Sequence, residues 1–426
     1  MPAPSQPFPR SLPLDAAGLR LLPERQARAI AAGFDLAALP EGFHADPYPV
    51  YHALRMHAPV HRTASGCVLT RHADLEAVYK DTVTFSSDKK REFGPKYGAS
   101  PLYEHHTTSL VFNDPPLHTR VRALMMGALN QRAIARMEAG VVSLVERLAD
   151  SFPPGEFDFI DSFAARIPVE VIGNLLDIPG GERGSLRAWS IAILSGLEPR
   201  PSAEMLERGN RAVVDFKDYL ARLVDERRRK PGDPESDVLT RLIQGESNGE
   251  RLSALELYHN CIFLLNAGHE TTTNLIGNGL WLLLSNENQL GFLRSNPALL
   301  PTAIEEMLRY DGPIQLNNRR LTAPITLGGT TLPEGAFVTL GIGAANRDPR
   351  QFADAERFDV ARKPNRHVAF GHGDHACAGM NVARMEARVA FNRLLKRFSR
   401  IEPCGAPERD RRIRFRGFRK LPVRAS

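Results

Sequence analysis

Apolar side chains recur at three- and four-residue spacings along most of the chain between residues 46 and 311. This period predicts amphipathic helices, so we expect a mainly helical region there. A further helix is expected near the end of the chain, after a glycine-rich loop. The clearest predicted helices are residues 49–56, 73–80, 116–130, 132–150, 210–229 and 380–398.

Shorter segments alternate between apolar and polar positions, which predicts strands. Two lie early in the chain, at residues 60–62 and 67–70, and two later, at residues 319–332 and 337–340. The pair Gly328-Gly329 predicts a tight turn inside the third segment. The chain should therefore add a smaller β region to its helices.

One predicted helix is much longer than the others. Ser253 and Glu256 fit a capping box, and the following residues stay compatible with a helix to about Ser285. Such a helix is about 50 Å long at about 1.5 Å per residue. Its middle is a poor helix sequence, which indicates that something other than helix propensity requires these residues. It reads Ala267-Gly268-His269-Glu270-Thr271-Thr272-Thr273.

The composition is that of an ordinary globular protein, with 426 residues of which 42% are hydrophobic. We see no internal repeat or linker, so we predict a single α+β domain over residues 1–426, with residues 1–45 wrapping its surface. No apolar stretch approaches the ~20 residues of a membrane span. The four cysteines form no C-x-x-C pair, which excludes a zinc ribbon. We expect a soluble, cytoplasmic protein with reduced thiols.

The net charge of +6 is concentrated at the C-terminus. Residues 408–426 hold eight basic and two acidic side chains, and the rest of the chain is balanced. This argues against a nucleic-acid footprint over the whole chain. Arg412, Arg414 and Arg416 alternate with Ile413 and Phe415, which predicts a strand with a solvated basic face. A docking face for an acidic partner is the alternative.

The glycine-rich loop admits four interpretations. A dinucleotide fingerprint needs an acidic residue about twenty positions further on, where Lys396 stands instead. A zinc site from nearby histidines and Cys377 lacks the usual ligand spacing. A plain connector is a third interpretation. The fourth is a thiolate ligand for haem iron, because glycines permit a sharp loop and the next helix aims its amides at the sulfur. The loop reads Phe370-Gly371-His372-Gly373-Asp374-His375-Ala376-Cys377-Ala378-Gly379.

This loop resembles the haem-binding segment of the cytochrome P-450 monooxygenases, F-G-x-G-x-H-x-C-x-G, at every fixed position. Ala383, Arg384 and Glu386 are similar to the start of the family's next helix. The resemblance implies the P-450 fold, a haem b cofactor and Cys377 as axial iron ligand. It also assigns cofactor contacts to Phe370, Gly371, His375 and Gly379.

The middle of the long helix resembles the family's oxygen-activation motif. The resemblance places Ala267 and Gly268 beside the haem and makes Glu270 and Thr271 catalytic. A carboxylate next to a hydroxyl can relay protons. The alternative is a helix turn whose threonine hydroxyls donate to preceding carbonyls.

Two further motifs concern architecture and the haem propionates. Glu306 and Arg309 resemble the family's structural E-x-x-R pair, and their spacing places them on one helix face. By resemblance His118 and Arg122 hold propionates, together with His375 and with Arg319 or its neighbour Arg320. We expect Arg120 and Arg347 to be solvated instead.

The predicted activity is insertion of one oxygen atom from O₂ into a mid-sized, mainly apolar organic substrate. No room for a fused reductase is expected, so electrons should come from a separate acidic ferredoxin and its reductase. We expect a monomer that binds neither nucleic acid nor membrane. The alternatives are a peroxide-driven peroxygenase, which would not need Glu270 and Thr271, and a haem-based sensor.

The resemblance also places residues 88–109, 263–271, 313–318 and 417–418 in the substrate pocket. The first of these segments is rich in basic side chains, which suggests an anchor for a substrate carboxylate. A mobile, solvated loop is the alternative. The basic residues concerned are Lys89, Lys90, Arg91, Lys96, His105 and His106.

The cysteine count generates the first testable prediction. Replacing Cys67, Cys261 and Cys404 together with Ser or Ala should leave the CO-bound thiolate spectrum intact, because only Cys377 lies in the haem-binding motif. The measurement is a dithionite-reduced CO difference spectrum. The ligand assignment is wrong if the triple variant loses this spectrum while Cys377→Ala keeps it.

Overall fold

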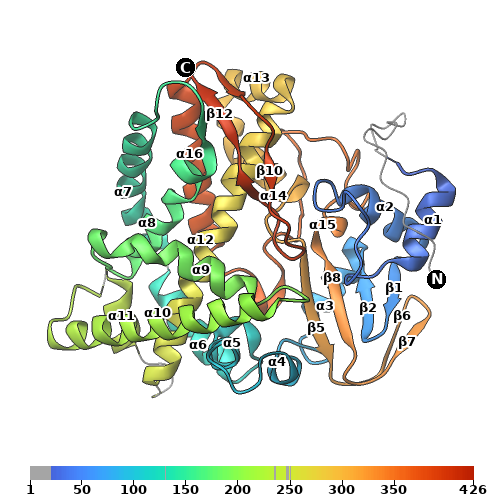
Figure 1. Ribbon diagram of the computed structural model, residues 1–426, viewed down its shortest axis with the longest axis horizontal. Helices are drawn as coiled ribbons and strands as arrows, with labels where there is room; N and C mark the ends of the chain where they lie inside the picture. Colours follow the sequence, from blue (N-terminus) through green and yellow to red (C-terminus); the bar gives the residue numbers. More distant parts are fainter. Residues whose placement is uncertain (1–20, 130, 235–236, 246–248, 250) are drawn as a thin grey trace. The chain divides into compact units, whose positions relative to one another are not determined.

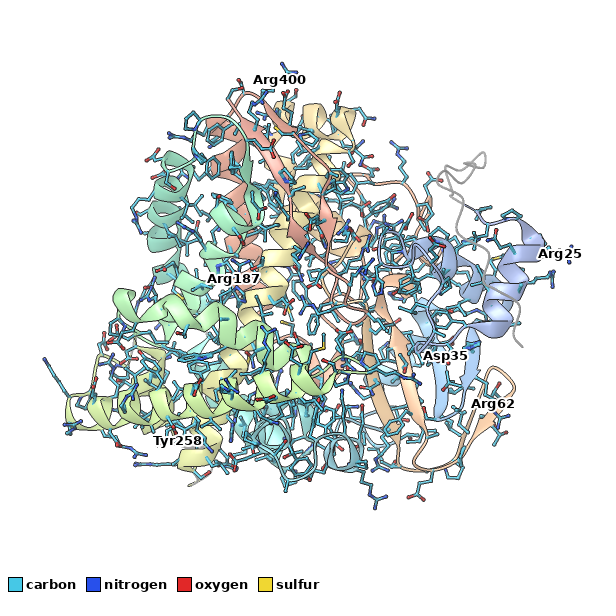
Figure 2. The ribbon with its side chains drawn as sticks, in the orientation of Figure 1. Arg25, Asp35, Arg62, Arg187, Tyr258 and Arg400 are labelled. Atoms are coloured by element: carbon cyan, nitrogen blue, oxygen red, sulfur yellow. The ribbon has the colours of Figure 1, made fainter. Side chains whose placement is uncertain are left out.

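The computed structural model describes residues 21–426 apart from residues 130, 235–236, 246–248 and 250. The chain forms two compact units, each built from interleaved segments (Figure 1). Unit 1 comprises Met1–Ser86, Asn278–Ala376 and Pro407–Arg419, and unit 2 comprises Ser87–Gly277, Cys377–Ala406 and Lys420–Ser426. A single domain stays a prediction. Figure 2 draws the side chains on the same ribbon and labels, among others, Arg62 on the first strand and Tyr258 on the long helix.

Unit 2 is mainly helical. Its strands form one small antiparallel sheet in which β12 lies between β4 and β9. The helices are α4 (Lys90–Tyr97), α5 (Pro101–Thr108), α6 (Leu117–Ala128), α7 (Gln131–Asp150), α8 (Arg166–Leu175), α9 (Leu186–Ser195), α10 (Ala203–Arg229), α11 (Val238–Gln244), most of α12 (Ala254–Leu284) and α16 (Met380–Arg397). The strands are β4 (Phe157–Asp158), β9 (Ile401–Pro403) and β12 (Pro422–Ala425).

The long helix is confirmed as α12. Ser253 Oγ accepts from the Glu256 N–H at 3.2 Å, and the Glu256 carboxylate accepts from the Ser253 N–H at 2.9 Å, so the predicted capping box is present. The helix continues as one α-helix through its β-branched centre, because residues 272–280 are all buried. Tertiary packing thus outweighs the poor local propensity.

Pairs of helices in unit 2 are held by complementary faces. Helices α7 and α16 run side by side in Figure 1 and are joined by the ion pairs Arg388–Glu138, Arg393–Glu146 and Arg397–Asp150. Helices α9 and α10 meet through the stacked rings of Trp189 and Phe216, with centroids 4.9 Å apart. The apolar stripes that predicted these helices are the faces they bury.

Unit 1 contains a five-stranded sheet in the order β1-β2-β8-β5-β3, in which only the β2–β8 pair is parallel. Its strands are β1 (Val60–Thr63), β2 (Gly66–Leu69), β3 (Phe85–Ser86), β5 (Leu316–Leu321) and β8 (Phe337–Gly341). Two hairpins accompany it, β6 (Ile325–Leu327) with β7 (Thr330–Leu332), and β10 (Glu408–Arg409) with β11 (Phe418–Lys420). The helices are α1 (Glu24–Gly33), α2 (Tyr48–His57), α3 (His72–Lys80), α13 (Glu287–Ser295), α14 (Leu300–Tyr310) and α15 (Ile342–Ala345).

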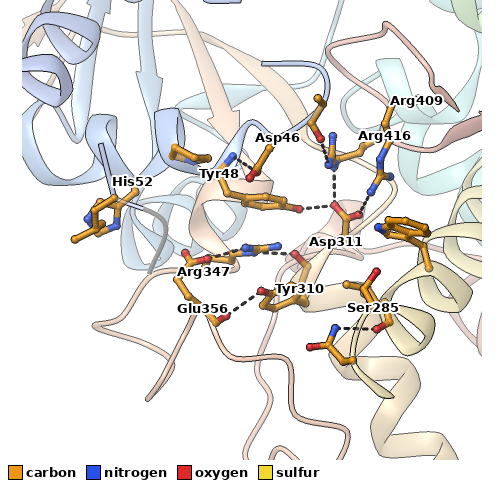
Figure 3. Close-up of a pocket in the computed structure, with 16 residues that line it drawn as sticks. Asp46, Tyr48, His52, Ser285, Tyr310, Asp311, Arg347, Glu356, Arg409 and Arg416 are labelled. Atoms are coloured by element: carbon orange, nitrogen blue, oxygen red, sulfur yellow. Dashed lines mark hydrogen bonds and ion pairs between the residues drawn. The ribbon is translucent and has the colours of Figure 1, made fainter. Parts of the chain in front are cut away.

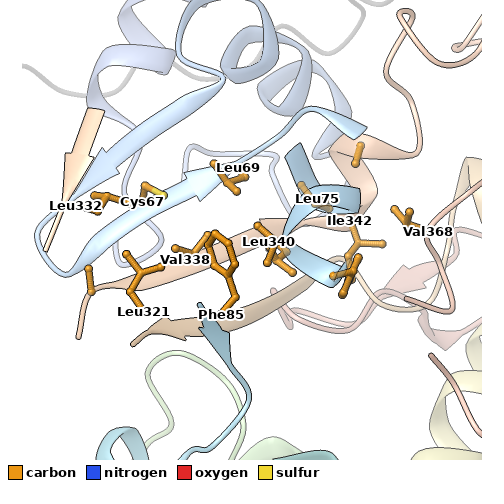
Figure 4. Close-up of a cluster of buried hydrophobic side chains, with 14 residues drawn as sticks. Cys67, Leu69, Leu75, Phe85, Leu321, Leu332, Val338, Leu340, Ile342 and Val368 are labelled. Atoms are coloured by element: carbon orange, nitrogen blue, oxygen red, sulfur yellow. The ribbon is translucent and has the colours of Figure 1, made fainter. Parts of the chain in front are cut away.

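One face of this sheet is the core of unit 1 (Figure 4). Leu69, Val338 and Leu340 pack against Leu75 of α3, and each is at most 2% exposed. Full burial of one such side chain contributes about 1.5–3 kcal/mol. The predicted turn at Gly328 is confirmed: its φ of +52° lies in the left-handed region that favours glycine.

The prediction for residues 1–45 needs correction. Residues 1–20 lie outside the described residues, but the part that follows does not merely wrap the surface. Ala31, Phe34 and Phe43 are buried in a hydrophobic cluster with Tyr51 and Leu54 of α2. The apolar residues of α1 therefore complete a second core of unit 1.

Glu306 and Arg309 form a bidentate ion pair on α14, and both side chains are 0% exposed. Arg309 also donates to the carbonyls of Asn346, Ala355 and Arg357, and Glu306 accepts from Arg362. The predicted pairing is thus confirmed, and it ties α14 to the irregular segment that precedes the glycine-rich loop.

The interpretation of the C-terminal arginines was wrong, because they do not form a solvated strand face. Arg416 donates to Asp311 Oδ1 at 2.6 Å, and Arg409 donates to Asp311 Oδ2 at 2.8 Å (Figure 3). Tyr48 donates to the same carboxylate at 2.7 Å. These groups line a cavity of about 350 Å³ in unit 1. The positive charge of the arginines holds the pKa of Asp311 below its usual range, although burial alone would raise it.

Arg347 was expected to be solvated, but it is buried. It is 6% exposed, lies between the rings of Tyr48 and Tyr310, and pairs with Glu356 at 2.7 Å. The two aromatic faces stabilise the buried guanidinium by cation–π contact. The spacing of residues in the sequence could not predict these contacts.

Among the described residues, no helix is both long and apolar enough to span a bilayer.

The Glu306–Arg309 pair generates the second prediction. Glu306→Gln should lower the thermal unfolding midpoint strongly, because an unpaired buried arginine costs about 3–5 kcal/mol. Glu138→Gln, the matched control, breaks a pair whose side chains are about 40% exposed. That control should cost less than about 1 kcal/mol. Equal midpoints for the two variants would show that the buried pair does not stabilise the fold.

Candidate functional site

The middle of α12 presents an open face between neighbours in the helix that are mostly buried. Phe263, Ala267 and Thr271, spaced four apart, are half-buried, exposed and half-buried, whereas Glu270 is 4% exposed. Thr271 Oγ1 donates to the Ala267 carbonyl at 2.6 Å, so the back-bonding alternative is present. Donation leaves the lone pairs of the hydroxyl able to accept a further hydrogen bond. The helix thus combines an accessible hydroxyl with an adjacent buried carboxylate.

Close packing between two helices requires a glycine at position 268. A Cβ atom at this position would lie 2.7 Å from Ile172 Cδ1 of α8, closer than side chains tolerate. The glycine therefore lets α8 approach α12 at the level of the open face. Its predicted contact with the cofactor stays a prediction.

Cys377 lies three residues before α16 and is half-buried. Burial raises the pKa of its thiol, whereas donation from the Gly379 N–H and the charges of Arg122 and Arg384 lower it. The groups that lower the pKa of Cys377 are a hydrogen-bond donor and two positive charges, which are the groups that stabilise a thiolate. The structure thus brings Cys377, Gly379 and Arg122 together within unit 2.

His118 and Arg122 lie one turn apart on α6, His118 buried and Arg122 half-buried. Arg120 was expected to be solvated, but it forms an ion pair with Glu256 near the start of α12. This pair holds α6 against α12. The sequence could not show it, because the partners are 136 residues apart.

The remaining residues of the glycine-rich loop belong to unit 1. Gly373 and His375 form a single 3₁₀ turn, and His375 is half-buried. A Cβ atom at Gly373 would lie 2.6 Å from the Tyr79 carbonyl oxygen, and φ is +67° at both Gly371 and Gly373. These two glycines are therefore needed for the loop's conformation. Phe370 has its ring 6.0 Å from that of His367.

Arg319 and Arg320 can be told apart in the structure. Adjacent residues on β5 point to opposite faces of the sheet. The Arg319 guanidinium is buried and lies 5.7 Å from the centroid of the Tyr79 ring, and Tyr79 contacts the loop glycines. Arg319 is thus the arginine on the loop side of the sheet.

Glu386 was noted in the sequence only as a family landmark, but the structure makes it a titratable group of the site. It is 2% exposed on α16, and the Thr272 hydroxyl of α12 donates to its carboxyl. Burial raises the pKa of Glu386 to about 8, and the hydrogen bond from Thr272 opposes this. A glutamate in an apolar helical pattern was the only signal in the sequence, and it is weak.

The interpretation of the basic segment as a solvated loop is wrong, whereas the carboxylate anchor stays a prediction. Lys89 is 2% exposed and pairs with Glu92 at 2.9 Å, and Lys96 donates to the Glu198 carbonyl at 2.6 Å. His105 and His106 are also buried. The segment forms α4 and α5, so it is not a solvated loop, and its buried cations are engaged by the protein. The spacing of basic residues does not reveal such internal partners.

The residues present fit a haem group, which needs an axial ligand, cations for two propionates and apolar surface. Unit 2 contributes Cys377 with its N–H donor, Arg122 and the open face of α12. Within unit 1, considered by itself, Arg319 is buried, and the buried hydroxyl of Tyr79 has no hydrogen-bond partner among the residues that the structure describes. A buried hydroxyl of this kind can donate to an acceptor the protein itself does not supply.

Comparison with known proteins identifies the family. The family model for Cytochrome P450 matches residues 198–289 and 293–422. Cytochrome P450 107B1 of Saccharopolyspora erythraea is 37% identical over 410 residues, which cover 92% of this chain and 98% of the relative. Polyketide biosynthesis cytochrome P450 PksS of Bacillus subtilis is 34% identical over 400 residues, or 90% of this chain and 97% of the relative.

A solved structure extends the similarity to the fold. The crystal structure of P450BioI in complex with hexadec-9Z-enoic acid ligated acyl carrier protein matches with a TM-score of 0.86 and 32% identity. The match covers 91% of this chain and 100% of that chain. The fold is therefore the mainly helical cytochrome P-450 fold with its smaller β region, as expected from the resemblance.

The chain belongs to the cytochrome P-450 family. It is accordingly an oxidoreductase of the monooxygenase type, in a family that carries a haem-thiolate cofactor. The dinucleotide, zinc and connector interpretations of the glycine-rich loop are thereby superseded.

Glu386 generates the third prediction. A carboxyl whose pKa is raised on folding stabilises most below its unfolded pKa of about 4.5. Its contribution falls by about 1.4 kcal/mol per pH unit until the pH passes the folded value, which is about 8. Glu386→Gln, which cannot ionise, should therefore unfold at a higher temperature than the wild type at pH 8.5, with a smaller difference at pH 5. A difference that does not change with pH would contradict the burial of a neutral carboxyl.

Proposed function

We propose that the protein holds a haem b through Cys377 and oxygenates a mid-sized, mainly apolar organic substrate. The observation that carries the proposal is the placement of Cys377 just before α16. There its sulfur accepts the Gly379 N–H and lies in the field of Arg122 and Arg384. Both features favour the thiolate form that iron ligation requires. The bound haem would supply the redox chemistry by which O₂ is reduced and split.

The other cofactor residues have roles that follow from their charge and burial. His118, Arg122, Arg319 and His375 would neutralise the propionates, since buried carboxylates need strong donors or cations. The register of β5 favours Arg319 over Arg320. Ala267, Gly268, Phe370, Gly371 and Gly379 have small or flat side chains, or none, and so would permit close approach of the macrocycle.

Glu270 and Thr271 would deliver protons during oxygen reduction. The Glu270 carboxylate is buried, so it can exchange protons in a site with poor access to bulk water. The Thr271 hydroxyl donates to a carbonyl of its own helix and lies at the open face. Its oxygen is therefore fixed in direction and able to accept a hydrogen bond from a water or a protonated group.

The substrate and partners are proposed more coarsely. The open face of α12 has an aromatic, a methyl and a hydroxyl side chain, which suits an apolar molecule. PksS is named for polyketide biosynthesis, and P450BioI was crystallised with an acyl carrier protein. Polyketide-like or carrier-linked acyl chains are therefore the first compounds to test. Electrons would come from a ferredoxin and its reductase, and a monomer in the cytoplasm stays a prediction.

The fourth prediction tests the mechanism. Thr271→Ala should leave haem binding normal but uncouple turnover, so that NADH is consumed and hydrogen peroxide is released with little organic product. Glu270→Gln should instead slow oxygen consumption, because the relay loses its ionisable member. The stoichiometry of NADH, peroxide and product is measured with a compound selected by a low- to high-spin shift of the haem spectrum.

Thr273→Ala is the matched control. Thr273 makes the same back-bond, to the His269 carbonyl at 2.9 Å, but is buried two residues beyond the motif. It should keep normal coupling. If Thr271→Ala is as well coupled as this control, the segment is not the oxygen-activating motif. Product formation from peroxide alone at the full NADH-driven rate would favour the peroxygenase, and no turnover with either would favour the sensor.

A further inference from the structure

Three buried histidines of unit 2 lie against one another between α5 and α12. His105, His106 and His259 are 2%, 1% and 0% exposed. The ring centroids of His105 lie 5.0 Å from His106 and 5.4 Å from His259. We call these three residues the histidine latch.

Hydrogen bonds join the latch to both helices. His259 Nε2 of α12 lies 2.9 Å from Glu104 Oε1 of α5, and His105 Nε2 lies 3.4 Å from Asn266 Nδ2. The Asn260 side chain of α12 accepts from the Leu110 N–H at 3.0 Å. Polar and imidazole groups thus link the segment from α5 to residue 110 with α12 at three points.

Among the described residues, charged and titratable groups meet the latch from α5, α10 and α4. Glu104 on α5 is the carboxylate, and Lys217 of α10 donates to the same oxygen at 2.9 Å, which offsets its pull on a proton. From α4, the Tyr97 ring packs against His106 at an angle of 38°, and its hydroxyl donates to the Gly196 carbonyl, while the Lys96 ammonium lies over the Tyr97 ring. His259 therefore faces one carboxylate, whose charge Lys217 offsets, whereas the ring of His105 packs against the two other imidazole rings.

Protonation of this cluster is costly for two reasons. Burial lowers the pKa of His105 well below its ordinary value, and the neighbouring rings of His106 and His259 lower it further. Burial also lowers the pKa of His259, and Glu104 only partly compensates. Once α5 leaves α12, the same rings are solvated and regain an ordinary pKa of about 6.5.

We propose that the histidine latch is a pH-sensitive fastening of α5 to α12, closed while its rings are neutral and released as they take up protons. The sign follows from linkage. A histidine whose pKa is lowered in the closed state stabilises that state fully above about pH 6.5 and less as the pH falls below it. Between pH 7.5 and 5.5 one such histidine shifts the equilibrium towards opening about 10-fold, and two shift it about 100-fold.

The consequence for activity rests on the proposed function. By family resemblance α5 belongs to the wall of the substrate pocket, so release of the latch would regulate access to that pocket. The fastening itself does not depend on this assignment and can be tested without a substrate.

The test is amide hydrogen exchange of the haem-loaded protein at pH 7.5, 6.5 and 5.5. Protection factors, corrected for the intrinsic exchange rate at each pH, are compared for peptides covering residues 101–109 and residues 131–150. The second peptide spans the whole of α7, which contains no histidine. Protection of residues 101–109 should fall about 10- to 100-fold between pH 7.5 and 5.5, while that of α7 stays constant.

The double variant His105→Phe/His259→Gln keeps a ring and an amide donor at the two positions whose pKa burial lowers, and neither replacement can gain charge. Its protection of residues 101–109 should vary little with pH. A wild-type profile that is flat over this range overturns the proposal, as does a double variant with the wild-type fall. The wild-type profile decides alone if the variant does not load haem. Because the readout is exchange, a failed latch is distinguishable from a failed haem assignment, which the CO spectrum reports.

Discussion

The arrangement of unit 1 depends on two buried charges that stabilise only as a pair. Glu306 and Arg309 are both removed from water, a change that costs several kcal/mol for each ion. Hydrogen bonds to further groups offset this cost. Arg309 donates to three carbonyls, and Glu306 accepts from Arg362 and from the Asp359 N–H. Those partners all lie in the irregular segment before the glycine-rich loop. The ion pair thus fixes a segment that has almost no regular secondary structure of its own.

A second cluster of buried charges fixes the position of the C-terminal segment of unit 1. Asp311 directly follows the last residue of α14. Its carboxylate accepts hydrogen bonds from Arg409, Arg416 and Tyr48, which come from segments far apart in the sequence. Arg416 also donates to the carbonyls of His44 and Ala45. Both clusters use arginine, whose fork of donors reaches several acceptors at once. Helix α14 therefore carries two anchors, one towards the loop and one towards the C-terminal segment.

Local patterns in the sequence predict much of this molecule. The capping box, the long helix, the Gly328 turn and the glycine-rich loop each depend on residues close together in the chain, and each is present. The burial of Arg416 could not be predicted from the sequence. Arginines that alternate with Ile413 and Phe415 give the same pattern in a solvated strand and in an irregular segment. Their partners, and those of His105 and Glu386, lie on other elements. Which of Arg319 and Arg320 lies on the loop side of the sheet is shown only by the register of β5 and the contact of Arg319 with Tyr79, and its role towards a propionate stays a prediction.

The pH responses of α12 show why its polar residues are arranged as they are. Near its start the helix meets the histidine latch, whose closed state is weakened as the pH falls below about 6.5. In its middle Thr272 meets Glu386, whose buried carboxyl has a pKa of about 8 and is therefore better accommodated as the pH falls. Acid thus loosens the attachment of α5 while it strengthens the contact of α12 with α16. The two groups therefore respond to acid in opposite directions, although both lie along the same helix.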